Sequence, residues 1–172
     1  MKKEQELSKV SDFIIYFIMY LFTCFAGTIF VGFARSSKFI IELFGLKISG
    51  EVVLSSIFLV IIAVLLNELF RLRKNIAEYI FGLLKNSVKV SEELQQGLES
   101  LLAAFLLVPL LLSAGSYFYP LCGAYSILII IILFIIMYYY IFQFVKSWKS
   151  DLEKLLLNIY QYIKKKKEEK KE

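Results

Sequence analysis

Side chains able to do acid–base, nucleophilic or metal chemistry are few in this chain, and they lie far apart. The sequence contains no histidine, and its two aspartates, Asp12 and Asp151, both flank apolar segments. General acid–base catalysis needs a group whose pKa can be brought near neutrality, most often a histidine or one of a pair of carboxylates. The serines stand in no nucleophile-elbow pattern, and no glycine-rich phosphate loop is present. We therefore expect no enzymatic activity and no catalytic residue.

The two cysteines offer no metal or cofactor site. Cys24 lies in the middle of an apolar segment and Cys122 lies in the short segment 119–123, near the expected outer surface, so a disulfide between them is not expected. Neither belongs to a cluster with metal-ligand spacing. Cys24 is interpreted as a small apolar packing residue. We expect no metal, no cofactor-binding residue and no cofactor.

Weakly polar and small side chains recur at helical spacing on one face of two apolar segments. They are Tyr16, Tyr20, Thr23 and Gly27 in the first segment, and Ser56, Ala63 and Asn67 in the second. Small residues let membrane helices approach closely, and hydroxyls form hydrogen bonds between them, so helix packing is the favoured interpretation. The alternative is a narrow pore lined by these faces in an oligomer, since a channel can gate through apolar constrictions without charges.

Four apolar segments must position these side chains. They cover residues 13–33, 52–70, 98–119 and 124–144, and each is close to the ~20 residues with which a helix crosses a bilayer. Hydrophobic residues make up 59% of the 172 and are gathered in these blocks. This pattern predicts a single all-α, polytopic membrane domain over residues 1–172, with four transmembrane helices arranged as two hairpins and extended by cytoplasmic helices.

Ionisable side chains are missing from the centres of these segments. Residues 13–33, 52–67, 101–119 and 124–144 contain no Asp, Glu, Lys, Arg or His. A charged group inside a bilayer is costly and is usually kept for a functional reason. The sequence therefore disfavours a pump or a proton-coupled antiporter.

Basic residues are distributed unevenly between the two sides of the expected membrane. Three precede the first segment, five lie in a connector at residues 71–97 and nine follow Phe144, which makes 17, against three (Arg35, Lys38 and Lys47) between the first two segments. Because basic residues near membrane ends stay in the cytoplasm, we expect both termini and the connector to be cytoplasmic. The expected location is the cell inner (plasma) membrane.

The two outer connections are expected to differ. Residues 35–51 are too apolar for a solvated loop, and we expect a short helix on the outer membrane surface, interrupted by Gly45 and Gly50. The uncharged segment 119–123 predicts a tight turn between the third and fourth spans. Pro109 should kink the third helix because it removes one backbone hydrogen bond.

The connector and the tail are expected to form intracellular helices. The second helix should extend towards Leu84, the third should begin at Glu92 after Ser91 as its N-cap, and residues 145–172 should continue the fourth. Apolar residues recur at helical spacing on both parts: Leu72, Ile76, Ile80 and Leu83, then Trp148, Leu152, Leu155 and Ile159. Such a stripe must be buried against a membrane surface, a second subunit or a soluble partner, so we expect an oligomer or partner platform.

Basic side chains beside the membrane are expected to contact anionic lipid headgroups. They are Arg71, Arg73, Lys74, Lys146 and Lys149. Nucleic-acid binding is not expected, because the lysines at the end of the chain alternate with glutamates such as Glu168 and Glu169. The expected partners are membrane lipids, further copies of the chain in a homo-oligomer, and a cytosolic protein.

The arrangement resembles small four-span membrane components of bacterial antiphage systems, such as the Rex-type exclusion channel and the membrane subunit of the Kiwa system. The matching features are the Arg71-Leu72-Arg73-Lys74 run after the second span, the long connector, the uncharged segment 119–123 and the charged tail. The resemblance carries no catalytic or binding motif. It implies a homo-oligomer that either depolarises the membrane or recruits a cytosolic effector.

Three hypotheses for the function follow. The favoured one is a non-enzymatic, homo-oligomeric membrane sensor or anchor that engages a cytosolic partner through its intracellular helices in antiphage defence. The first alternative is a homo-oligomeric ion-conducting pore that depolarises the membrane. The second alternative is a structural subunit of a larger membrane complex.

Overall fold

A computed structural model describes the backbone of residues 2–43, 45–84 and 92–168. In these ranges the chain forms long helices and one β-hairpin: α1 (Lys2–Ser37), β1 (Ile40–Leu43), β2 (Leu46–Ser49), α2 (Gly50–Leu84), α3 (Glu92–Cys122), the 3₁₀ turn η1 (Gly123–Tyr125) and α4 (Ser126–Glu168). The predicted predominance of helix is confirmed. Side chains are described for residues 8–42, 45–80 and 93–149.

Three stretches of the described chain are long and apolar enough to cross a membrane. They are Ser8–Ser37, Gly50–Ile80 and Glu93–Lys149. The last stretch is 57 residues long and includes both α3 and α4, which are joined through η1. The chain therefore has the length and composition of a helical membrane protein, as its apolar segments predict.

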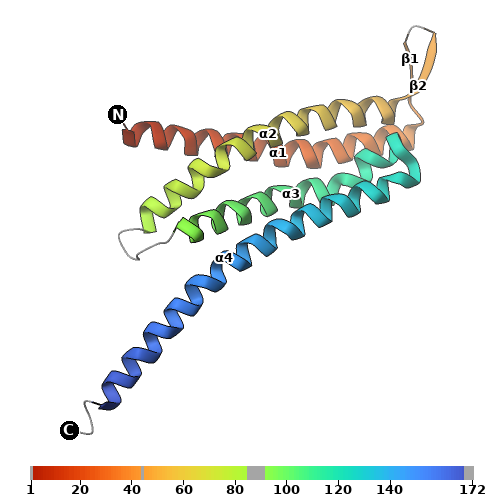
Figure 1. Cartoon of the computed structure of the whole chain (residues 1–172). Helices are drawn as coiled ribbons and strands as arrows, with labels where there is room; N and C mark the ends of the chain where they lie inside the picture. The colour runs from red at the N-terminus through yellow and green to blue at the C-terminus, as the bar shows by residue number, and fades with distance from the viewer. Residues whose placement is uncertain (1, 44, 85–91, 169–172) are drawn as a thin grey trace.

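The helices form two antiparallel pairs, with α3 as the central element (Figure 1). α1 packs along α2, whereas α3 packs against α1, α2 and α4. The β-hairpin and the η1 turn lie at one end of the bundle, called here the hairpin end. The beginning of α1, the last turns of α2 and the beginning of α3 lie at the opposite end, called here the terminal end.

The core lies between α1, α2 and α3. It contains two tyrosines, one cysteine and aliphatic side chains, all at most 7% exposed: Tyr20, Cys24, Val31, Ile62, Leu65, Leu69, Leu106, Leu110 and Tyr117. On α3, small residues such as Ala103 and Ala114 have no exposed surface. Small side chains allow helix backbones to approach closely, which explains how one helix packs against three others.

Several expected helix boundaries are confirmed. α2 continues without interruption to Leu84, α3 begins at Glu92, and α4 continues through the tail to Glu168. α1 begins at Lys2, well before the expected start of the first span at residue 13, so the polar residues that precede the span are helical too. Ser91, the expected N-cap of α3, lies outside the described residues.

The expectation of a helix within residues 35–51 is wrong, because this segment forms the β1–β2 hairpin. The strands pair in antiparallel register, with Ile41 opposite Ile48 and Glu42 opposite Lys47. β-Branched residues favour strands, and apolar and polar residues alternate with a period of two from Ile41 to Leu43 and from Leu46 to Ser49. Gly45 has a φ of +78° at the turn, a conformation that glycine adopts at little cost. The glycine marks a hairpin turn instead of a helix break.

The turn between α3 and α4 lies later than expected. α3 continues through Pro120 to Cys122, and the chain reverses in η1, where Gly123 has a φ of +54°. A positive φ favours glycine, whereas Pro120 interrupts only one hydrogen bond near the end of the helix. α3 also continues through Pro109, whose carbonyl accepts a hydrogen bond from the Ser113 hydroxyl at 2.8 Å. The kink at Pro109 stays a prediction.

Candidate functional site

The first polar site in the bundle is Tyr20 on α1. This side chain has no exposed surface, and its hydroxyl donates a hydrogen bond to the carbonyl oxygen of Leu106 on α3 at 2.7 Å. A tyrosine in an apolar interior needs such a partner, because a buried hydroxyl without an acceptor is destabilising. Tyr20 therefore joins α1 to α3 by a directional contact.

A second tyrosine makes the reciprocal connection from α3 to α1. The Tyr117 hydroxyl lies 2.7 Å from the carbonyl oxygen of Cys24 and 3.0 Å from that of Thr23, and it donates to them. Gly27 lies directly beneath it, where an added Cβ would clash with the Tyr117 hydroxyl and the Phe58 ring. Gly27 is thus required by the close approach of two aromatic side chains from α3 and α2.

The predicted polar face of α1 is therefore used mainly in helix packing. Tyr20 and Gly27 are buried and Tyr16 is half-buried, whereas the Thr23 hydroxyl donates to Met19 of its own helix at 2.7 Å. Phe58 of α2 and Tyr117 of α3 lie against Gly27 on this face.

The predicted face of α2 points away from the core. Ser56, Ala63 and Asn67 are all exposed, and the Ser56 hydroxyl donates to Val52 of its own helix at 2.9 Å. The neighbouring Ser55 is the serine that is fully buried. The structure does not bring the α1 and α2 faces together within one chain.

Tyr117 and Ser113 were not identified as candidates from the sequence. A signal was available: Leu106, Leu110, Ser113 and Tyr117 follow one another at spacings of four, three and four, which places them on one face of a helix. This face is buried in the structure.

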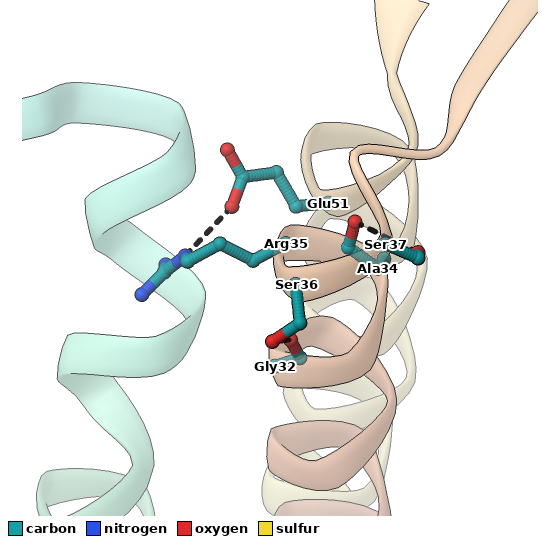
Figure 2. A network of polar contacts seen from close by, with 6 residues as sticks. All are labelled: Gly32, Ala34, Arg35, Ser36, Ser37 and Glu51. Atoms are coloured by element: carbon teal, nitrogen blue, oxygen red, sulfur yellow. Dashed lines mark hydrogen bonds and ion pairs between the residues drawn. The ribbon is translucent and has the colours of Figure 1, made fainter.

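At the hairpin end, Arg35 connects three helices. Its Nε lies 2.7 Å from Oε2 of Glu51 at the start of α2, and its Cζ lies 5.3 Å from the centre of the Tyr119 ring on α3. Figure 2 shows the side chains of Arg35 and Glu51 pointing towards each other from their two helices. The Arg35 side chain is 45% exposed, so the ion pair contributes little stability, on the order of 0.2–1 kcal/mol.

At the terminal end, Arg73 differs from the other predicted lipid-binding residues. Its Cζ lies 4.8 Å from the Phe70 ring and 5.5 Å from the Tyr140 ring, which connects α2 to α4. Its Nη1 atom is buried and has no hydrogen-bond acceptor among the described residues. The Arg73 side chain is thus half-buried and makes cation–π contacts with two aromatic rings.

The remaining basic residues predicted to contact lipid lie on the surface. Arg71, Lys74, Lys146 and Lys149 are exposed, and Arg71 lies 4.0 Å from Glu68 on the same helix. Lys9 of α1 also belongs to this end, where its Nζ donates to Oδ1 of Asn75 at 3.1 Å.

The connector half of the predicted platform is largely occupied within the chain. Ile76 is 7% exposed, and Leu72 and Ile80 are half-buried. In the described part, α2 and α4 meet at Phe70 and Tyr140 and are not a packed pair.

The tail residues of the predicted platform lie on the C-terminal part of α4. Trp148 is 49% exposed, and the centre of its ring lies 5.5 Å from the centre of the Phe144 ring. The backbone continues as helix through Leu152, Leu155 and Ile159. The side chains of these three residues, and that of Leu83 in α2, lie outside the described part.

Comparisons with known proteins assign no family to the chain. No family model, no curated protein and no solved structure matches it. Among the described residues, no group of three or more His, Cys, Asp and Glu side chains is placed to hold a metal ion.

Proposed function

We propose that the chain is a non-enzymatic integral membrane protein that forms a homo-oligomeric sensor or anchor and engages a cytosolic partner through the tail of α4. The observation that carries this proposal is the length of α4. It is a continuous helix of 43 residues, about 64 Å at ~1.5 Å per residue, whereas a bilayer core is ~30 Å thick. A helix of this length extends well beyond the membrane.

The arrangement of the helices supports a four-span topology. Residues 93–149 run as α3 and α4, which fold back on each other at η1, and each of the two helices is long enough to cross a bilayer. The beginning of α1 and the end of α2 lie together, as shown by the hydrogen bond between Lys9 and Asn75. With the 17 basic residues on this side, both termini and the connector are assigned to the cytoplasm of the inner membrane.

The tail is the part of the platform that we assign to binding. Figure 1 shows α4 continuing past the ends of the other helices and away from them. Trp148, Leu152, Leu155 and Ile159 repeat at spacings of four, three and four on this helix. These four residues form an apolar stripe, called here the seam. Such a stripe suits a helical partner, either from a cytosolic protein or from a second copy in the oligomer.

The resemblance to antiphage membrane components supplies the biological setting of the proposal. In that setting the membrane domain responds to an infection event, and the tail recruits or releases an effector. The basic surface residues Arg71, Lys74 and Lys146 hold the terminal end against anionic headgroups, each worth ~1 kcal/mol near the surface.

The tail assignment is tested with a seam variant and a matched control. Leu155→Lys places a charge on the seam, whereas Asn158→Lys places the same charge beside it on the helix. The full-length protein is purified in detergent from cells with isotope-labelled cytosol, and co-purifying proteins are quantified together with protection of the host against phage. We expect Leu155→Lys, and not Asn158→Lys, to lose both a specific protein and protection. Retention of both by Leu155→Lys would refute the proposal.

An ion-conducting pore remains a second candidate because of one observation on α2. Ser56 and Asn67 are exposed within the apolar part of this helix. A polar side chain facing hydrocarbon is destabilising, so an oligomer that turns the α2 faces towards a common axis would hydrate or pair it. Ion flux from liposomes containing the protein tests this candidate, and Asn67→Leu should reduce the flux. Liposomes that remain tight at all voltages would exclude a pore.

A further inference from the structure

The β1–β2 hairpin has one apolar and one polar face. Its register places Ile41 opposite Ile48, and Leu46 lies two residues before Ile48 on the same face. The other face carries the cross-strand pair of Glu42 and Lys47 near the turn, and Ile40 opposite Ser49 at the base. The half of the hairpin nearer its turn is therefore amphipathic.

The rest of the described chain covers this apolar face only in part: Ile41 and Ile48 are half-buried, whereas Leu46 nearer the turn is exposed. The hairpin is held at its base, where the Gly50 N–H donates to the Phe39 carbonyl at 2.7 Å, and it packs on no helix other than the start of α2. Leu46 is 66% exposed. A two-stranded hairpin is at best marginally stable in water unless its apolar face packs against something.

The position of the hairpin indicates what covers this face. Figure 1 shows that the hairpin projects sideways from the end of the α1–α2 pair and does not continue along the helix axes. If these helices cross a membrane, the hairpin runs along the membrane surface. The same end carries the exposed aromatic residues Tyr119 and Tyr125, a type that concentrates at the membrane–water interface.

The apolar surface and the charges around the hairpin fit a lipid leaflet. Phe30 and Phe33 are exposed on the last turns of α1, and Phe39 continues this apolar surface to the base of the hairpin. The basic residues Arg35, Lys38 and Lys47 outnumber Glu42 and Glu51 in this region, which suits lipid phosphate groups. We propose that the hairpin is a membrane-surface anchor whose Ile41, Leu46 and Ile48 face is embedded in the interfacial zone of the lipid leaflet, with Lys38 and Lys47 directed to the phosphates.

The proposal rests on insertion of α1 and α2 into a membrane, and it is independent of the partner proposed for the α4 tail. Fluorescence quenching tests it. The chain has one tryptophan, Trp148, so Trp148→Phe provides a background without tryptophan. Leu46→Trp then probes the apolar face and Lys47→Trp, the next residue, probes the polar face. Leu112→Trp on α3, where the native side chain is 74% exposed, is the reference for direct lipid contact.

Each full-length variant is reconstituted into vesicles of phosphatidylcholine and phosphatidylglycerol. Brominated acyl chains quench tryptophan from the lipid side, and acrylamide quenches it from the water. We expect blue-shifted emission and lipid quenching for Leu46→Trp, and acrylamide quenching for Lys47→Trp. Ile48→Trp reports on the same face as Leu46→Trp and replaces it if that variant aggregates.

Three results would overturn the proposal. Equal acrylamide quenching at both positions, with no lipid quenching, would place the hairpin in water. Lipid quenching at both positions would contradict the assignment of the two faces. Protection of Leu46→Trp from both quenchers would show a protein-covered face, and loss of that protection on dilution in detergent would identify a second copy as the occupant. Lipid quenching of Leu112→Trp in the same vesicles shows that membrane insertion itself has not failed.

Discussion

α3 and α4 are neighbours in the sequence and each contains a long apolar segment, yet they occupy different positions in the bundle. α3 packs against three helices and buries alanines such as Ala103 and Ala114 completely. α4 packs along α3 and exposes large aliphatic and aromatic side chains, including Ile127, Ile131, Phe134, Ile135 and Phe142.

The difference between the two helices lies in side-chain size. Between residues 127 and 145, α4 contains no Gly, Ala or Ser, whereas α3 has two groups of such residues, within 97–104 and 113–116. In a membrane, lipid tails solvate large apolar side chains as well as a protein interior does, so close packing depends on small residues and hydrogen bonds between helices. α3 is thus built for protein contacts and α4 for lipid or for another subunit.

The largest effect on stability is expected for Gly27→Leu on α1, at the contact with α3. The new side chain would collide with the Tyr117 hydroxyl and the Phe58 ring, and overpacking of this kind costs about 3 kcal/mol or more. We expect a large loss of thermal stability in detergent, measured by the loss of monodisperse protein on heating. Gly32→Leu on the same helix is the matched control, since nothing lies within 4 Å of its Cβ position. Equal stability of the two variants would contradict the packing of α1 against α3.

The second test adds volume to α3 and removes it from α4. Ala114→Leu on α3 fills a position with no exposed surface and should destabilise the protein by about 1–3 kcal/mol. Ile135→Ala on α4, where the side chain is 60% exposed, should change stability by less than about 0.5 kcal/mol. Unfolding in mixed detergent micelles measures both. A larger effect for Ile135→Ala would show that α4 is the buried helix.

The third test removes one hydroxyl. Tyr117→Phe deletes the hydrogen bonds to the carbonyls of Thr23 and Cys24 and should cost roughly 0.6–1.7 kcal/mol, the range found for hydrogen bonds between membrane helices. Tyr138→Phe on α4, where the side chain is 62% exposed, is the control and should be neutral. Identical unfolding curves for both variants would mean that the Tyr117 hydroxyl contributes no net stability.

The smallest effect is expected where α4 meets α2. Arg73→Gln removes the cation–π contacts with Phe70 and Tyr140, worth about 0.5–1 kcal/mol, and Lys74→Gln removes an exposed charge beside it. We expect Arg73→Gln to increase proteolysis within α4 in detergent and Lys74→Gln to leave it unchanged. If both variants were cleaved at the wild-type rate, Arg73 would not hold α4 to α2.

Much of the secondary structure followed from local sequence signals. The extension of α2 to Leu84 and the start of α3 at Glu92 agree with the structure because uninterrupted helical residues and acidic first-turn residues act locally. The hairpin at residues 40–49 does not follow from the sequence, because a short apolar segment fits either a helix or a strand and a glycine suits both a helix break and a hairpin turn. The later turn between α3 and α4 depends on the positive φ of Gly123, which Pro120 obscured in the sequence.

The candidate site followed from the sequence only in part. The spacing of Tyr20 and Gly27 identified a packing face, but their partners on α3, Leu106 for Tyr20 and Tyr117 for Gly27, lie 86 and 90 residues away in the chain, and no local pattern connects them. The Ser56 face has the same kind of pattern and yet points outward, because the neighbouring Ser55 is the serine turned inward.

The sequence by itself determined the helical content, the length of the helices and an apolar composition suited to a membrane, since each follows from local propensity and hydrophobicity. The tertiary structure decided which faces are buried, which helix is central and which side chains meet. The physical reason is that a helix bounded by lipid is apolar on every side, so hydrophobic periodicity does not mark its buried face. Burial is set instead by the fit of small residues to large ones, as Gly27 fits beneath Tyr117, and by hydrogen bonds across helices, as Tyr20 bonds to Leu106.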